Sequence, residues 1–188
     1  MTDPCRLIVG ISGASGVIFG VRLLEGLKAL PVETHLVMTR TAELTLAHET
    51  DFRASDVRRL ADVAYKIDDL AAAISSGSYR TMGMIVAPCS MRSLSEIAHG
   101  ITSNLLTRAA DVVLKERRKL VLVARETPLH AIHLRNMTSL AEMGVIIAPP
   151  VPAFYNRPKT LDEVVNHTVG RILDLFDLDT GKVKRWRT

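Results

Sequence analysis

The sequence has few aromatic residues, only two cysteines and no long uninterrupted hydrophobic run. Aromatic side chains make up 4% of the 188 residues, which argues against nucleic-acid platforms that stack bases on Phe, Tyr and Trp. Cys5 and Cys89 are too few for a disulfide framework, so we expect a reducing, cytoplasmic location. The glycine-containing stretch 7–21 lacks a cleavage-site pattern, and no run approaches the ~20 apolar residues of a membrane helix. We therefore expect neither a secretory signal nor a membrane span.

The charges of the chain are nearly balanced. Lysine and arginine number 24 against 20 aspartates and glutamates, which gives a net charge of +4. The densest basic run, residues 115–119, is interrupted by Glu116. Proteins that bind nucleic acid usually cluster their basic residues on one face. We therefore expect small anionic ligands and no nucleic-acid partner.

Short apolar, β-branched runs alternate with helical patterns along the whole chain. Strands are predicted at 6–11, 32–39, 84–87, 120–124 and 145–148, with Pro88 ending the third. Helices are predicted at 19–30, 41–49, 55–61, 68–75, 93–99, 103–118, 132–143 and from a capping box at Thr160 to about 175. The pattern predicts one α/β domain over 1–188, with a doubly wound parallel sheet, helices on both faces and a basic tail from about 179. Such sheets bind ligands at the carboxyl ends of their strands.

A glycine-rich turn, residues 10–16, follows the first predicted strand and precedes a helix. Its spacing matches neither the dinucleotide-binding motif nor a P-loop. The turn is either a phosphate or flavin site at a helix N-terminus, or a plain tight turn in which Ser15 caps the helix.

Polar residues also follow the third and fourth predicted strands. Ser90 and Ser93 suit an anion, whereas Cys89 is either a nucleophile or, more simply, inert packing. Arg125 can bind phosphate with two hydrogen bonds, and Glu126 can carry a proton. The alternative for that pair is a salt bridge within the loop.

Charged residues recur on one stripe of the predicted helix 103–118, namely Arg108, Asp111, Lys115 and Arg118. From the pattern alone this is a solvated face with an Asp111–Lys115 pair. Tyr155 follows the fifth strand in a proline-rich loop, and Arg171 lies on the last helix.

Two further features suggest little chemistry. His130 and His133 lack a third ligand nearby, so no metal is expected. Trp186 lies in the basic tail and is a candidate for contact with a neighbouring subunit.

Four segments together resemble the UbiX/Pad-type flavin prenyltransferases over roughly residues 6–186. They are G-I-S-G-A-S-G, V-A-P-C-S-M, the run from Thr107 to Pro128, and P-P-V-P-A-F-Y. The resemblance implies a flavodoxin-like, three-layer Rossmann fold, a homododecamer with sites at subunit junctions, and no metal. It implies that reduced FMN, as a substrate, is joined to dimethylallyl phosphate. The product is prenylated FMN, the cofactor of a UbiD-type decarboxylase, used in ubiquinone synthesis or aromatic acid decarboxylation.

The same resemblance assigns roles to individual residues. FMN would be held by Gly13, Ala14, Ser15, Thr39, Ser90, Met91, Arg92, Ser93 and Arg125. Dimethylallyl phosphate would be bound by Tyr155 and Arg171, and the catalytic positions would be Ser15, Glu49, Arg108, Lys115 and Glu126. Thr39 stands where many members have Ser, and it preserves the hydroxyl.

Two other functions remain open at this stage. One is an FMN-dependent decarboxylase of the cysteine-decarboxylase type, whose substrate segment differs from the P-P-V-P-A-F-Y-N found here. The other is a non-enzymatic flavin carrier, for which the Arg125–Glu126 pair and Arg171 would be superfluous. The sequence does not distinguish dimethylallyl phosphate from the pyrophosphate.

Overall fold

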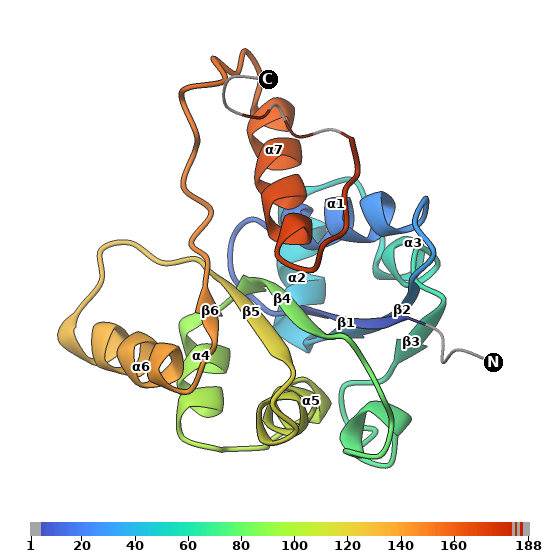
Figure 1. Ribbon diagram of the computed structural model, residues 1–188. Coiled ribbons are helices and arrows are strands. Elements are labelled where there is room, and N and C mark those ends of the chain that lie inside the picture. Colours follow the sequence, from blue (N-terminus) through green and yellow to red (C-terminus); the bar gives the residue numbers. More distant parts are fainter. Residues whose placement is uncertain (1–4, 182, 184, 186–188) are drawn as a thin grey trace.

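A six-stranded, fully parallel sheet forms the centre of the protein (Figure 1). The computed structural model describes residues 5–181, 183 and 185. The strands are β1 (Arg6–Ile11), β2 (Glu33–Met38), β3 (Val63–Tyr65), β4 (Gly83–Cys89), β5 (Lys119–Ala124) and β6 (Ile146–Ile147), in the order β3-β2-β1-β4-β5-β6. The helices are α1 (Ile18–Leu27), α2 (Arg40–Glu49), α3 (Ala54–Arg58), α4 (Met91–Ala98), α5 (Leu105–Lys115), α6 (Ala131–Glu142) and α7 (Leu161–Asp174).

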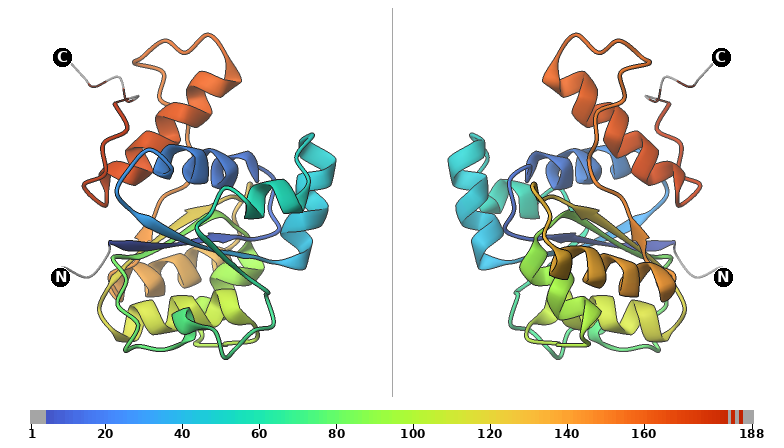
Figure 2. Two further views of the ribbon diagram at one scale, coloured as in Figure 1. Left: turned by 90° about the vertical axis from the view of Figure 1, so that its right-hand side faces the viewer. Right: turned by 90° about the vertical axis from the view of Figure 1, so that its left-hand side faces the viewer.

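The sheet separates two hydrophobic cores, because successive residues of a strand point to opposite faces. Leu7, Val9 and Ile11 of β1 pack with α1, α2, α3 and α7, whereas Ile8 packs on the other side with α4, α5 and α6. Figure 2 shows these two helical layers above and below the sheet. The expected α/β, doubly wound, flavodoxin-like fold is confirmed.

The chain order reverses direction between β1 and β4, which are hydrogen-bonded neighbours. The connection after β1 leads to α1 in one helical layer, and the connection after β4 leads to α4 in the other layer. This is the switch point at which doubly wound sheets bind ligands.

Three predictions for single elements were wrong. The short edge strand β3 was missed, and the helix expected over 68–75 is a series of turns with one 3₁₀ turn, Ala73–Ser75. Strand β4 continues through Pro88, because Cys89 resumes the pairing opposite Ala124 after a register shift.

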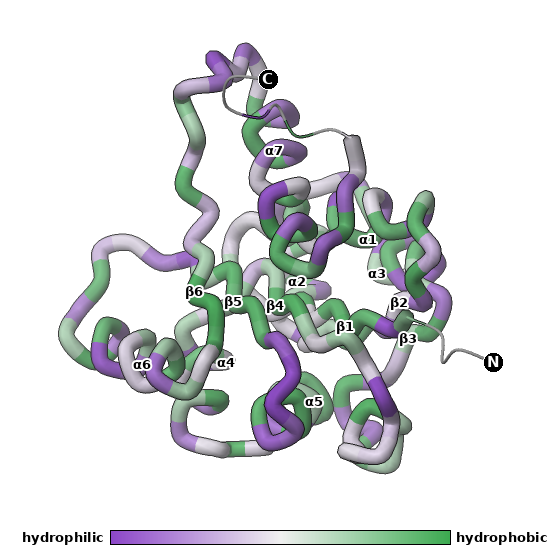
Figure 3. Tube along the Cα trace, viewed as in Figure 1, coloured by the Kyte–Doolittle hydropathy of each residue, from purple (hydrophilic) through white to green (hydrophobic). Residues whose placement is uncertain are grey.

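The hydropathy of the chain follows this architecture. Figure 3 shows hydrophobic residues concentrated in the central strands and a polar connection between α5 and β5. The basic run 115–119 occupies that connection, at the amino end of the sheet. No helix within the described residues is both long enough and apolar enough to cross a bilayer. Trp186 lies outside the described residues, as do residues 182, 184, 187 and 188 of the predicted basic tail.

Candidate functional site

A buried serine that the sequence reasoning did not single out joins the two loops at the switch point. The Ser12 hydroxyl donates to the Pro88 carbonyl at 3.0 Å and accepts from the Ser90 amide at 2.7 Å. The loop after β1 and the start of α4 are therefore held together by one fully buried side chain. The sequence feature that could have identified Ser12 is its position directly after a buried strand.

A hydroxyl-rich cavity of about 340 Å³ lies beside this junction. Two helices begin at its wall: Thr39 caps α2 by accepting from the Ala42 amide at 3.1 Å, and Ser90 caps α4 by accepting from the Ser93 amide at 3.2 Å. Helix N-termini attract anions because their first amides lack partners. The cavity is lined by Thr39, Arg40, Thr41, Ile67, Asp68, Ser90, Arg92, Ser93, Glu96, Ser103 and Asn104. This donor set suits a phosphorylated, polyhydroxylated ligand such as FMN.

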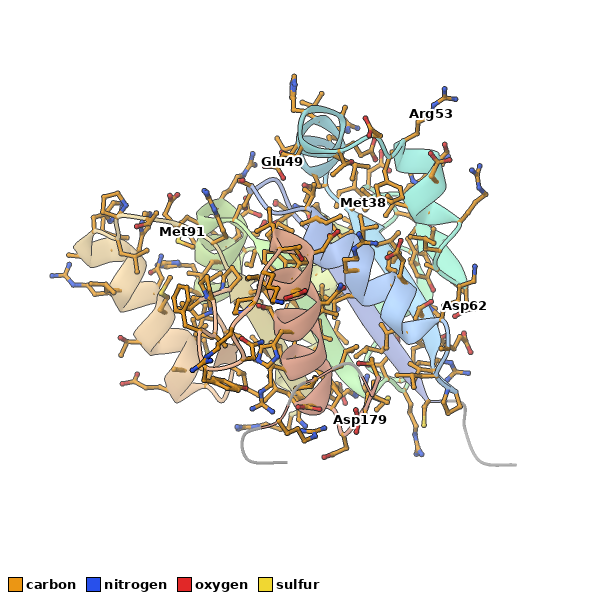
Figure 4. The ribbon with its side chains drawn as sticks, turned by 90° about the horizontal axis from the view of Figure 1, so that it is seen from above. Met38, Glu49, Arg53, Asp62, Met91 and Asp179 are labelled. Carbon is orange, nitrogen blue, oxygen red and sulfur yellow. The ribbon has the colours of Figure 1, made fainter. Side chains whose placement is uncertain are left out.

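Several residues of this cavity were not predicted. Ser103 donates to Glu96 at 2.7 Å, and Glu96 also accepts from the Arg92 side chain at 2.9 Å. Glu96 is mostly buried, whereas Arg92 extends over the cavity with its side chain 82% exposed. Met91, labelled in Figure 4, is half-buried and packs against the core of the α4 layer.

The glycine-rich turn packs against α2, and its Ser15 does not cap α1. Gly13 lies so close to α2 that an added Cβ would be 2.4 Å from the Thr41 Cβ. Ala14 and Ser15 follow in the turn, but α1 begins only at Ile18 and its N-cap is Val17. Ser15 is therefore not a helix cap, which corrects that alternative.

Glu49, the last residue of α2, places its side chain at the N-terminus of α1. Its carboxylate accepts from the Gly16 amide at 2.8 Å and from the Val17 amide at 3.3 Å (Figure 4). A carboxylate at this position is favoured by the partial positive charge of the helix end. The amides that would have received a phosphate are thus occupied by the protein itself, and Glu49 is brought to the glycine-rich turn.

A second cavity, of about 450 Å³, contains Ser15, Arg125 and Glu126. Its other walls are largely apolar and come from Phe19, residues 149–152, Leu161 and Val165. The Arg125 amide donates to the Cys89 carbonyl at 3.2 Å, which fixes this loop to the end of β4. No ion pair joins Arg125 to Glu126 in the described part of the chain, so the alternative of a loop salt bridge is wrong. The Glu126 carboxylate instead accepts from the Thr127 amide at 3.0 Å.

A third cavity, of about 480 Å³, is lined by Tyr155, Arg171, Val183 and Arg185. Arg171 lies on α7 and forms an ion pair with Asp174 at 2.6 Å. Tyr155 comes from the proline-rich loop before α7. The two residues expected to bind dimethylallyl phosphate therefore face one cavity.

The charged stripe of α5 lies elsewhere. Arg108 donates to the Ser75 carbonyl at 3.2 Å and pairs with Asp111 at 2.8 Å, while Lys115 pairs with Glu116 at 2.5 Å. The expected Asp111–Lys115 pair is not formed, because Asp111 pairs with Arg108 and Lys115 pairs with Glu116. Lys115 ends α5 at the amino end of the sheet, opposite the end that carries Ser15. One chain therefore does not bring Lys115 to the other site residues, and Arg108 lines none of the three cavities.

The remaining candidates have structural roles. His130 caps α6 by accepting from the Ile132 and His133 amides, and its ring stacks on that of His133. Searching the described residues gives no group of three His, Cys, Asp or Glu side chains that could hold a metal. Burial raises the pKa of the Cys89 thiol to about 12, so it is not a nucleophile at neutral pH.

Comparison with known proteins shows what this chain resembles. Residues 1–173 match the sequence profile of the Flavoprotein family. The chain is 62% identical over 185 residues to the flavin prenyltransferase UbiX of Escherichia coli K12, covering 97% of this chain and 98% of that protein. It is 59% identical over 181 residues to a probable UbiX-like flavin prenyltransferase of Bacillus subtilis, covering 96% and 89%.

Solved structures agree with these relatives. AnUbiX, solved in complex with FMN and dimethylallyl pyrophosphate, superposes with a TM-score of 0.96 at 53% identity, covering 98% of both chains. A dodecameric FMN-dependent UbiX-like decarboxylase of Escherichia coli O157:H7 gives a TM-score of 0.96 at 54% identity, covering 97% of this chain and all of that one. A cysteine decarboxylase at 19% identity and a TM-score of 0.64 shares the fold alone. The chain belongs to the Flavoprotein family and, within it, to the UbiX flavin prenyltransferases.

Proposed function

We propose that this chain joins the dimethylallyl group of dimethylallyl phosphate to N5 and C6 of reduced FMN and releases phosphate. The observation that carries the proposal is the apolar cavity in which Ser15, Arg125 and Glu126 meet. It lies at the carboxyl end of the sheet, as does the hydroxyl-rich cavity. When bound, reduced FMN supplies the two ring atoms to which the prenyl group becomes attached.

The hydroxyl-rich cavity is the site we assign to the phosphate and ribityl chain of FMN. Thr39, Ser90 and Ser93 present hydroxyls and helix N-terminal amides there, and Arg92 adds a cation. Ser15 and Arg125 line the apolar cavity, and together with residues 13–14 and Met91 they are the residues that we assign to the flavin ring. The close contact of Gly13 with Thr41 keeps that loop tight against α2.

The apolar cavity is where we place the reacting groups. Phe19, the prolines and Leu161 give this cavity apolar walls, and a neighbouring copy that covers the exposed Leu161 would exclude water and so protect a developing allylic cation. Arg125 stabilises the negative charge that develops on the departing phosphate. Glu126 and Ser15 can move a proton between a phosphate oxygen and the flavin edge, and Glu49 stands nearby on the α1 N-terminus.

Tyr155, Arg171, Arg108 and Lys115 would complete the phosphate site across subunits. Tyr155 and Arg171 share a separate cavity, and Lys115 lies at the opposite end of the sheet. Their separation within one chain favours a homododecamer in which neighbouring copies contribute these cations to a site at their junction.

The surface near α7 supports such an assembly. Val151, Phe154 and Leu161 are 73%, 77% and 78% exposed, and large exposed apolar patches mark interaction surfaces. The relative from Escherichia coli O157:H7 is itself dodecameric. We further propose a cytoplasmic location and a UbiD-type decarboxylase as the recipient of the product.

The test is anaerobic incubation of the purified chain with reduced FMN and dimethylallyl phosphate, followed by mass spectrometry of the flavin. A flavin heavier by one prenyl group supports the proposal, as does activation of an inactive UbiD-type decarboxylase by the product. Unmodified flavin from either the phosphate or the pyrophosphate would contradict it. Consumption of a carboxylic acid with oxidised FMN, and no prenylation, would favour the decarboxylase. Light scattering at working concentration tests the assembly, and an active monomer would overturn it.

A further inference from the structure

The segment after α7 folds back onto that helix. It turns at Asp179, whose Oδ1 atom accepts from the Gly181 amide at 2.8 Å, and then runs back along α7 (Figure 1). Val183 packs so closely on Gly170 of α7 that a Cβ atom added to the glycine would overlap a Val183 methyl group. This part of the predicted basic tail is therefore docked on α7, and no proposed step above uses it.

The docked segment carries Arg185 to a carboxylate that also binds Arg171. Two nitrogens of Arg185, Nη1 and Nη2, donate to the two oxygens of Asp174 at 3.1 Å each, and Nη2 also donates to Asp179 at 3.2 Å. Arg171 donates to the same Asp174 carboxylate at 2.6 Å. The Asp174 side chain is only 14% exposed, and those of Arg171 and Arg185 are 55% and 43% exposed. One mostly buried carboxylate thus holds two exposed guanidinium groups together.

The two arginines face a cavity that contains no carboxylate. Arg171 and Arg185 both line the cavity of about 480 Å³, whereas the neighbouring aspartates line a separate hollow that the same arginines border. A guanidinium has five N–H donors. Among the described residues, Arg171 bonds through Nη1 alone and Arg185 leaves its Nε–H unused. Both side chains therefore retain donors for a ligand.

Two cations match the charge of a phosphate monoester better than one. Such a group carries a charge of about −1.5 to −2 at neutral pH. Guanidinium groups suit it because their planar donors bind two phosphate oxygens at once. Arg171 alone, the residue already assigned to the substrate phosphate, balances about half of that charge. Arg185 is the other arginine that lines this cavity among the described residues.

We propose that Arg185, held on Asp174 beside Arg171, is a second cation that binds the phosphate of dimethylallyl phosphate. The proposal rests on the proposed function, because it takes dimethylallyl phosphate as the ligand of this cavity. It gives the segment after α7 a direct part in substrate binding.

The test compares loss of the cation with loss of one of its attachments. Each protein is loaded with oxidised FMN, which leaves the substrate unreacted, and titrated with dimethylallyl phosphate by calorimetry. We expect Arg185→Ala to weaken binding about tenfold. Arg185→Lys keeps the charge without the planar donors and should recover part of the loss. Asp179→Asn removes one acid from Arg185 while Asp174 still holds it, so binding should be unchanged or tighter.

A matched control removes a cation elsewhere. Arg59 is likewise an exposed arginine in an ion pair, with Asp56 on α3, and it lines none of the three cavities. Arg59→Ala should therefore leave dimethylallyl phosphate binding unchanged. The Kd for FMN and the melting temperature show whether each variant is folded.

Several results would overturn the proposal. Equal losses in Arg185→Ala and Asp179→Asn would mean that Arg185 only ties the segment to α7. Unchanged binding in Arg185→Ala, an equal loss in Arg59→Ala, or an equal loss of FMN and dimethylallyl phosphate in both Arg185 variants would also overturn it. A wild-type chain that binds dimethylallyl phosphate but forms no prenylated flavin would refute the proposed function and leave this comparison readable. Failure of the wild type to bind dimethylallyl phosphate would refute both.

Discussion

Replacing Gly13 by alanine should disturb the flavin site through one identifiable contact. An alanine Cβ would stand 2.4 Å from the Thr41 Cβ, 2.6 Å from its Oγ1 and 3.0 Å from its backbone carbon. Neither a Cβ atom nor a backbone atom can rotate away, so the turn 12–17 and the start of α2 must separate. Both segments border the proposed flavin site, since Thr41 lines the hydroxyl-rich cavity and Ser15 the apolar one.

The size of the effect follows from the cost of overpacking. Forcing an extra carbon into a packed site costs about 1–3 kcal/mol. For a chain of this length each kcal/mol lowers Tm by about 2–4 °C. If the strain is relieved by opening the flavin site, the same free energy appears as weaker FMN binding, and about 1.4 kcal/mol corresponds to tenfold. We therefore expect Gly13→Ala to lower FMN affinity about tenfold or more, and to lower Tm as well.

Fluorescence titration of FMN and thermal melts measure these two quantities. Gly26→Ala is the matched control, because its added Cβ would meet atoms at 3.5 and 3.7 Å, which is ordinary contact. That change lies within α1 and should stabilise the protein by about 0.5–1 kcal/mol without affecting FMN.

A second substitution tests the cause. In a Thr41→Gly background the closest opposing atom is gone, so Gly13→Ala should lose much less affinity there than in the wild type. Equal losses in both backgrounds would refute the steric explanation. Wild-type affinity and Tm in Gly13→Ala itself would show that the loop yields without cost, and would refute the reasoning altogether.

Three further predictions concern the other site residues and the cysteines. Glu126→Gln should still bind FMN while turnover to prenylated flavin falls about 10²-fold or more, because Gln cannot carry a proton; wild-type rates by rapid mixing and mass spectrometry would leave Glu126 a structural role only. Arg171→Ala should weaken dimethylallyl phosphate binding about tenfold and leave FMN binding intact; an equal loss for both ligands in parallel titrations would indicate misfolding. At pH 8 iodoacetamide should label Cys5, which is exposed, and spare Cys89, whose thiol is fully buried with a pKa raised to about 12; peptide mapping that finds Cys89 labelled in the folded protein would contradict the packing described here.

The composition of the strands was enough to predict the architecture. Residues 7–11 and 120–124 are apolar at every position, which is typical of strands buried on both faces of a parallel sheet. Helix caps were readable where a hydroxyl or amide residue precedes a helical pattern, as at Thr160. Candidate ligand contacts could be placed after strands because parallel strands end at one edge.

Short elements were missed because their local signal is weak. Strand β3 has three residues, Val63–Tyr65, and exists because it pairs with β2 through backbone hydrogen bonds. The segment 68–75 has helix-forming residues but turns instead, with the Arg108 side chain bonded to the Ser75 carbonyl. In both cases a contact from a distant part of the chain outweighed local propensity.

Contacts between residues far apart in sequence were decided only by the tertiary structure. The sequence alone showed Glu49 and Gly16 as separate features, 33 positions apart, and only packing of α2 against the turn brings the carboxylate onto the Gly16 and Val17 amides just before α1. His167 and Tyr155 meet because the loop folds back on α7. Hydrophobic periodicity determines which face of an element is buried, since it depends on residue spacing alone. Which polar groups meet at the ends of those elements depends on how the elements pack, and spacing along the chain carries no information about that.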